Sequence, residues 1–162
     1  MNEAAQEVIA LIWIDIQRSR VVLRTELADG LPPVGGDRVQ LQQVIINLAR
    51  NALEAMVDVH DRPRELLIKT EHDSDEHVRL TVEDRGVGFG AQGLARLFDP
   101  FYTTKRDGMG MGLSVSHSII QSHHGRLWAE LNDGPGVRFA FSLPQRSGNT
   151  ALQTATIRRS GS

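Results

Sequence analysis

At 162 residues, the chain is long enough for one domain with a hydrophobic core and too short for two. Its composition, 40% hydrophobic and 23% charged with a formal net charge of −2, gives no electrostatic reason to expect nucleic acid or an anionic membrane as a partner. The absence of cysteine excludes disulfides, thiolate metal sites and thiol chemistry.

The first predicted element is a helix over residues 2–19, which Asn2 is expected to cap. Its apolar residues recur at helical spacing: Ala5, Val8, Ile9, Ile12 and Ile16. The apolar stretch over residues 8–14 is far shorter than the roughly 20 residues that span a bilayer. No basic region precedes it, so we expect a buried helix face rather than a signal peptide or membrane span.

A strand over residues 21–27 and a turn-rich segment lead to a second helix, which Asp37 is expected to cap. The apolar stripe of this helix consists of Leu41, Val44, Ile45, Leu48, Ala52 and Met56. A loop is expected over residues 57–64. Segments 66–71 and 78–83 are then predicted to be two consecutive strands, joined by a polar turn.

The remaining chain is predicted to hold a loop from residue 84, a short helix around residues 92–98 and a polar, glycine-rich loop. A helix over residues 113–124 and a hairpin of strands 126–131 and 137–143 follow. Residues 2–144 form the expected domain, and residues 145–162, which lack an apolar period, form an expected disordered tail. The order of elements predicts an α/β two-layer sandwich, in which helices cover one face of a mixed, largely antiparallel sheet.

Two asparagines stand one turn apart on the second helix. Asn47, Asn51 and Glu54 share a helix edge that borders the apolar stripe. Amide oxygens suit a hard cation such as Mg²⁺, directly or through water. Two solvated polar side chains explain the same pattern equally well.

A carboxylate followed by alternate glycines ends the strand over residues 78–83. Asp84 can accept a hydrogen bond from an exocyclic amine, while Gly86 and Gly88 let the loop pass close to a flat ring. An ordinary turn at a strand end, with an aspartate cap, has the same sequence.

The segment DGMGMGL (107–113) places three glycines at alternate positions ahead of a helix. Gly108, Gly110 and Gly112 leave backbone N–H groups available to an anion, and the helix from Leu113 adds its positive dipole end. Lys105 supplies a mobile cation for phosphate. A cluster of aromatic residues can anchor this loop to the core: Phe98, Phe101 and Tyr102. The pattern favours a phosphate cradle and a hinge here, and a plain glycine-rich loop has the same sequence.

Four segments, NLARNALEAM, DRGVG, FDPFYTTK and GMGMGLS, resemble the N, G1, F and G2 boxes of the histidine-kinase catalytic domain, in the same order. That domain belongs to the wider superfamily of gyrase, heat-shock chaperone, histidine kinase and mismatch-repair ATPases. The resemblance covers residues 2–144 and is greatest to the nitrogen-regulation and oxygen-sensing kinases. It implies the ATP-binding fold of the Bergerat type.

The resemblance also implies roles for individual residues. Asn51 would coordinate Mg²⁺, Asn47 would assist at the triphosphate and Asp84 would recognise the adenine amino group. Gly86 and Gly88 would shape the base pocket. The phosphates would be met by residues of the glycine-rich loop and the helix that follows: Lys105, Gly108, Gly110, Gly112 and Leu113.

The sequence departs from the family's pattern at three positions. Glu54 stands where relatives often carry a lysine that contacts the phosphates, so that contact is expected to fall to Lys105 or Arg106 instead. Arg85 stands where a small or amide residue is more usual, and Val137 stands where threonine is common. None of the six histidines has the context of a phosphoacceptor, so no catalytic role is expected for them.

The resemblance implies a cytoplasmic, monomeric module that binds ATP and Mg²⁺ and phosphorylates a histidine on a separate helical-hairpin domain of its parent kinase. A response regulator would be an indirect partner, and no direct membrane contact is expected. Without its acceptor, the module should turn over little ATP. The alternatives are a stand-alone serine kinase of the anti-sigma type and a non-catalytic interaction module.

Overall fold

The computed structural model describes residues 1–74, 76–88, 93, 96–99 and 112–146. Over this part of the chain, the helices are α1 (Asn2–Arg18), α2 (Arg38–Ala55) and α4 (Gly112–Ser122). The strands are β1 (Val22–Leu27), β2 (Glu65–Asp73), β3 (His77–Asp84), β4 (Arg126–Leu131) and β5 (Val137–Pro144). Residues 147–162 of the expected tail, residues 92, 94 and 95 of the expected short helix, and most of the glycine-rich loop lie outside the described residues. The first two residues of the expected tail are held by the fold: the backbone N–H groups of Gln145 and Arg146 donate to the carbonyl oxygens of Glu76 and Pro33, both at 2.7 Å.

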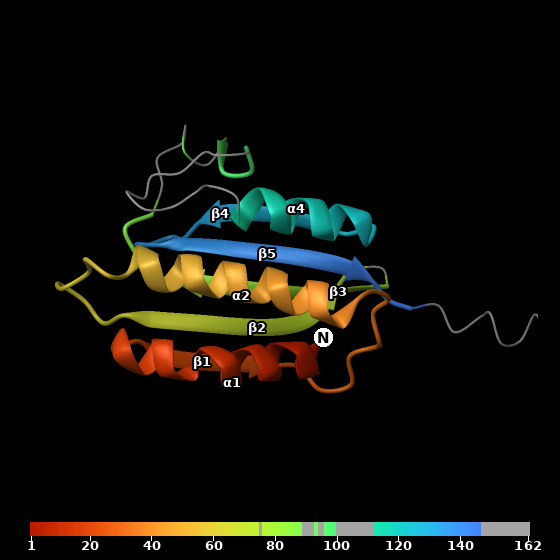
Figure 1. Ribbon diagram of the computed structural model, residues 1–162, viewed down its shortest axis with the longest axis horizontal. Helices are drawn as coiled ribbons and strands as arrows, with labels where there is room; N and C mark the ends of the chain where they lie inside the picture. Colours follow the sequence, from red (N-terminus) through yellow and green to blue (C-terminus); the bar gives the residue numbers. More distant parts are fainter. Residues whose placement is uncertain (75, 89–92, 94–95, 100–111, 147–162) are drawn as a thin grey trace, which may run out of the picture.

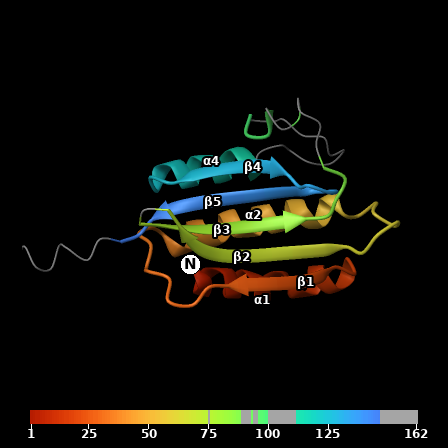
Figure 2. The ribbon, with the colours of Figure 1, turned by 180° about the vertical axis from the view of Figure 1, so that it is seen from behind.

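The five strands form one mixed sheet in the order β1-β2-β3-β5-β4. Strands β1 and β2 are parallel, with α2 in the connection between them, and every other neighbouring pair is antiparallel. The helices lie together over one face of the sheet, and the opposite view shows the strands uncovered (Figures 1 and 2). The expected two-layer α/β sandwich is therefore confirmed.

The two predicted helix caps have different outcomes. Oδ1 of Asp37 accepts hydrogen bonds from the backbone N–H groups of Val39 (2.9 Å) and Gln40 (3.3 Å), which confirms the cap of α2. The predicted cap at Asn2 is wrong: α1 begins after Met1, and no side chain caps it. Asn2 already lies in the first turn, and its Nδ2 donates to the carbonyl oxygen of Ala28 instead, at 2.8 Å.

The core lies between the helices and the inner face of the sheet. The whole predicted stripe of α2 is buried there, as are most of the α1 residues expected to face it. They pack against the alternate inward residues of the central strands: Leu66, Ile68, Leu80, Val82, Phe139 and Phe141. Burying one such side chain contributes roughly 1.5–3 kcal/mol, so this layer dominates the stability of the fold. No helix of the described segments is both long and apolar enough to cross a membrane.

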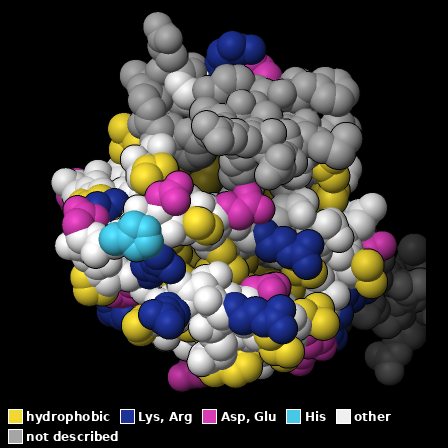
Figure 3. Space-filling view, turned by 60° about the vertical axis from the view of Figure 1, so that its left-hand side comes forward, with side chains coloured by type: hydrophobic (Ala, Val, Ile, Leu, Met, Phe, Trp, Pro, Cys, Tyr) yellow, Lys and Arg dark blue, Asp and Glu magenta, His cyan; other side chains and the backbone are white. Residues whose placement is uncertain are grey.

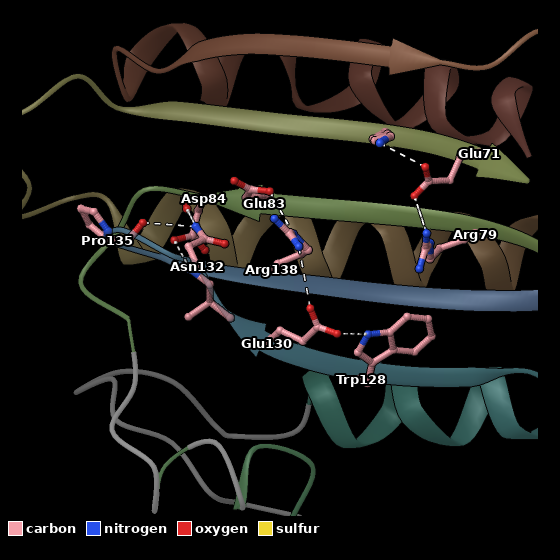
Figure 4. Close-up of polar contacts among 11 residues, drawn as sticks. Glu71, Arg79, Glu83, Asp84, Trp128, Glu130, Asn132, Pro135 and Arg138 are labelled. Atoms are coloured by element: carbon pink, nitrogen blue, oxygen red, sulfur yellow. Dashed lines mark hydrogen bonds and ion pairs between the residues drawn. The ribbon is translucent and has the colours of Figure 1, made fainter. Parts of the chain in front are cut away.

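The outer face of the sheet carries alternating charges that pair across strands (Figure 4). Glu71 on β2 lies 3.0 Å from the ammonium group of Lys69 and 2.8 Å from the guanidinium group of Arg79. Burial tends to raise the pKa of Glu71, but the hydrogen bond from Lys69 and the positive charges of Arg79 and Lys69 outweigh it. The pKa of Glu71 therefore lies below its ordinary value.

Substituting Glu71→Gln should lower the free energy of unfolding at neutral pH by less than about 1 kcal/mol, because the ion pairs are partly solvated. Since the folded-state pKa of Glu71 is depressed, its contribution is present above the unfolded-state pKa and is lost as pH falls through the folded-state value. Urea unfolding measures the free energy of unfolding of the wild type and of Glu71→Gln at about pH 7 and about pH 3. The difference between the two proteins should be smaller at the lower pH. A difference that does not change with pH contradicts the assignment.

Candidate nucleotide-binding site

Asp84 ends β3 and is 2% exposed. Its Oδ1 accepts hydrogen bonds from the backbone N–H groups of Gly86 (2.8 Å) and Val137 (3.4 Å). These donors come from the loop after β3 and from the start of β5, so the carboxylate is oriented by two segments distant in sequence. The predicted recognition residue is thus an oriented carboxylate at a strand end.

The loop after Asp84 packs against the C-terminal end of α2. Gly86 is buried, and a Cβ atom there would lie 2.6 Å from the carbonyl oxygen of Ala55. The backbone N–H of Val87 donates to that same carbonyl, at 3.2 Å. Gly88 has a φ of +74°, a backbone conformation that side chains rarely adopt. Gly86 is therefore needed for close packing against α2, a reason that the sequence did not indicate.

The turn between β4 and β5 meets the backbone of Asp84 from the other side (Figure 4). Nδ2 of Asn132 donates to the carbonyl oxygen of Asp84 at 2.8 Å and to that of Pro135 at 3.2 Å. Gly136 has a φ of +102°, and a Cβ atom there would lie 2.7 Å from the carbonyl carbon of Asp84. Sequence reasoning treated this segment as an ordinary turn, because its contacts are with a strand 48 residues earlier.

Arg62, in the loop between α2 and β2, is a second residue that sequence reasoning missed. Its Nε donates to the carbonyl oxygen of Arg85 at 3.0 Å, and its Nη2 donates to that of Gly86 at 2.9 Å. An arginine in a polar loop has no sequence feature that distinguishes it from a solvated one. At this end of the molecule, basic and acidic side chains are intermixed rather than gathered in a patch of one sign (Figure 3).

The predicted polar residues of α2 lie between the Asp84 loop and the start of α4. Nδ2 of Asn47 donates to the carbonyl oxygen of Gly112 (3.3 Å) and to Oγ of Ser116 (3.2 Å). Asn51 follows one turn later and is half-buried, whereas Glu54 is exposed. Asn47 therefore ties the two helices together, in addition to any contact with a ligand.

The glycine-rich segment is described only from its last glycine. α4 begins at Gly112, and Leu113 packs, partly buried, against the core. Lys105, Gly108 and Gly110 lie outside the described residues, as do Phe101 and Tyr102. Phe98 is partly buried against the core, and its ring stacks on that of His117 at 4.9 Å between centroids. This contact fits the expected aromatic anchor.

The described residues contain no group of three or more His, Asp or Glu side chains that could hold a metal ion. Mg²⁺ commonly uses one or two protein oxygens together with substrate phosphates and water. The half-buried Asn51 amide fits that mode of binding.

The oriented carboxylate at the end of β3 and the polar residues of α2 beside it fit the nucleotide-binding domain that the four sequence segments resemble. Residues 36–147 match the family described as histidine kinase-, DNA gyrase B-, and HSP90-like ATPase. The chain belongs to this family.

Its relatives include sensor kinases. The chain is 42% identical to the sensor protein FixL of Bradyrhizobium diazoefficiens over 149 residues, which cover 92% of the chain and 29% of FixL. It is 34% identical to sporulation kinase E of Bacillus subtilis over 146 residues, 90% of the chain and 19% of that kinase. The chain therefore spans less than a third of the length of these relatives.

Solved structures confirm the fold. The nucleotide-free catalytic domain of histidine kinase ThkA matches with a TM-score of 0.78 and 34% identity, over 90% of this chain and 92% of that one. The chain thus corresponds to nearly the whole of an isolated kinase catalytic domain. The resemblance drawn from the four sequence boxes is confirmed.

Proposed function

We propose that the chain is the ATP-binding catalytic domain of a sensor histidine kinase, which transfers the γ-phosphate of ATP to a histidine on a separate helical-hairpin domain. The observation that carries this proposal is the geometry of Asp84. Two backbone N–H groups orient its carboxylate at the end of β3, beside the C-terminal end of α2. An oriented, buried carboxylate suits an exocyclic amine such as the 6-amino group of adenine.

The residues for the phosphates would lie along α2 and at the entry to α4. Asn51 would hold Mg²⁺, which neutralises phosphate charge when bound. Asn47 would assist at the triphosphate while fixing the start of α4. Lys105 would supply a cation, and backbone N–H groups near the glycines and Leu113 would face the phosphates.

Positioning and electrostatic stabilisation provide most of the catalysis of phosphoryl transfer. The domain would hold the nucleotide between α2 and the glycine-rich segment and exclude water from it. We assign the base that activates the acceptor to the acceptor's own domain. The isolated domain should therefore hydrolyse ATP more slowly than about one turnover per second, the low end for kinases.

The proposed partners are the histidine hairpin of a parent kinase and, indirectly, a response regulator. Histidine kinase ThkA has been solved in complex with the response regulator protein TrrA, and this chain matches 40% of that kinase chain with 31% identity and a TM-score of 0.75. We propose a cytoplasmic location and a monomeric state for the isolated domain.

Calorimetric titration with ADP, with and without Mg²⁺, tests nucleotide binding by the chain itself. We expect binding with one-to-one stoichiometry that Mg²⁺ strengthens. Absence of binding in both conditions contradicts the proposal and favours an interaction module.

Transfer is tested by adding ATP and a separate histidine-hairpin domain from a related sensor kinase. The phosphorylated product should be labile in acid, as phosphohistidine is. An acid-stable phosphoserine product contradicts the proposal and indicates a serine kinase.

A further inference from the structure

Two residues outside the four motif segments hold the turn that follows β3. We propose that Arg62 and Asn132 are positioning residues that set the base selectivity of the nucleotide site. They fix the backbone around Asp84, so that its carboxylate meets an exocyclic amine and rejects a ring carbonyl at the same place. This inference rests on the proposed function, because it assumes that the site binds a nucleotide.

Asn132 fixes the carbonyl end of Asp84. Its Nδ2 donates hydrogen bonds to the carbonyl oxygens of Asp84 and Pro135. Its backbone N–H donates to the carbonyl oxygen of Gly136, at 3.2 Å, and so closes the turn. Rotating the amide by half a turn would set its oxygen against two carbonyl oxygens, so this arrangement has a single orientation.

The amide of Asn132 acts on the turn through its nitrogen. Its Oδ1 is buried and has no hydrogen-bond partner within the described part of the chain. The contacts that the side chain makes with the Asp84 backbone and with Pro135 are therefore the two hydrogen bonds donated by Nδ2.

Arg62 holds the opposite side of the turn. Its guanidinium group donates to two successive carbonyl oxygens, those of Arg85 and Gly86, and its side chain is 26% exposed. A planar guanidinium group can serve two converging acceptors at once, which the ammonium group of a lysine does less well. Gly86 in turn donates to Oδ1 of Asp84, so Arg62 acts on the carboxylate through one backbone residue.

Base selectivity is a readout that separates positioning from folding. ADP offers an amine to the carboxylate, whereas IDP carries a carbonyl oxygen at the same ring position. A fixed carboxylate should favour ADP strongly, because IDP leaves it facing an acceptor. A carboxylate that can shift should discriminate less, even in a folded protein.

The experiment measures the dissociation constants of ADP and IDP with Mg²⁺ for the wild-type chain, Asn132→Ala and Arg62→Lys. We expect the wild type to favour ADP by roughly 10–100-fold, the range of one charge-assisted hydrogen bond. Each variant should bind ADP about tenfold more weakly and IDP nearly unchanged, so that selectivity falls about tenfold. Asp133→Ala, an exposed residue in the same turn, is the matched control and should leave selectivity unchanged.

The outcomes are distinguishable. If the variants lose affinity for both nucleotides equally, or keep the wild-type selectivity, the inference is wrong while the proposed function stands. If the wild type binds neither nucleotide, the proposed function fails and the inference fails with it. Circular dichroism establishes which variants are folded; should Asn132→Ala not fold, Arg62→Lys, which keeps its charge, decides the matter.

Discussion

Substituting Asp84→Ala should weaken the binding of ADP by at least about 30-fold, the largest effect that we expect of any single side chain. The variant loses the proposed acceptor for the adenine amine. It also leaves the N–H groups of Gly86 and Val137 without the acceptor that they share, so one of the contacts that hold the loop is lost. Calorimetric titration with ADP and Mg²⁺ measures the loss directly.

Asp84→Asn separates recognition from loop geometry. The asparagine can keep an oxygen toward the two N–H groups, yet it removes the negative charge that strengthens a hydrogen bond from an amine. We expect a smaller loss of affinity, about tenfold, with little change in thermal stability. Binding of ADP by a folded Asp84→Ala variant with wild-type affinity would show that the site lies elsewhere.

Substituting Gly136→Ala should lower the free energy of unfolding by about 3 kcal/mol or more. The residue has a φ of +102°, and the added Cβ atom would overlap the backbone of Asp84 and lie 2.9 Å from Cα of Arg85. Relief requires the β4–β5 turn to move away from β3, which breaks the hydrogen bond from Asn132 to Asp84. Urea unfolding should report the destabilisation, and the folded fraction should bind ADP more weakly.

Gly134→Ala is the matched control in the same turn. A Cβ atom at Gly134 would have no other atom within 4 Å, and Gly134 is not among the glycines with positive φ. Its effect on the free energy of unfolding should stay within about 0.5 kcal/mol. Equal destabilisation by the two substitutions would mean that the close approach to Asp84 is not what requires a glycine at residue 136.

Those features that depend on local chemistry could be predicted from the sequence. The apolar stripe of α2 and its cap at Asp37 were correctly predicted, because helical periodicity and capping involve residues only a few positions apart. Asn2 was wrongly predicted as a cap, since its side chain reaches across to the carbonyl oxygen of Ala28, and a contact over 26 residues leaves no local pattern.

The supports of the candidate site could not be predicted for the same reason. Arg62 and Asn132 donate to backbone carbonyl groups, which every residue has, so the identity of their targets leaves no trace in the sequence. The sequence does not distinguish Gly136 from other turn glycines, because its close approach to Asp84 depends on the tertiary structure. The motif residues themselves were found because their types and order match a family pattern. The proposed ligand contacts of Asn51, Asp84 and Lys105 remain predictions.

Helix α2 connects the two ends of the candidate site and sets the distance between them. Ala55 contacts the loop of the carboxylate, and Asn47 contacts the entry to α4. These residues are eight positions apart, which corresponds to about 12 Å along a helix axis. A ligand that contacts both ends must therefore span a distance that the helix fixes. Inserting or deleting one residue between Asn47 and Ala55 would turn one end of the site by about 100° relative to the other.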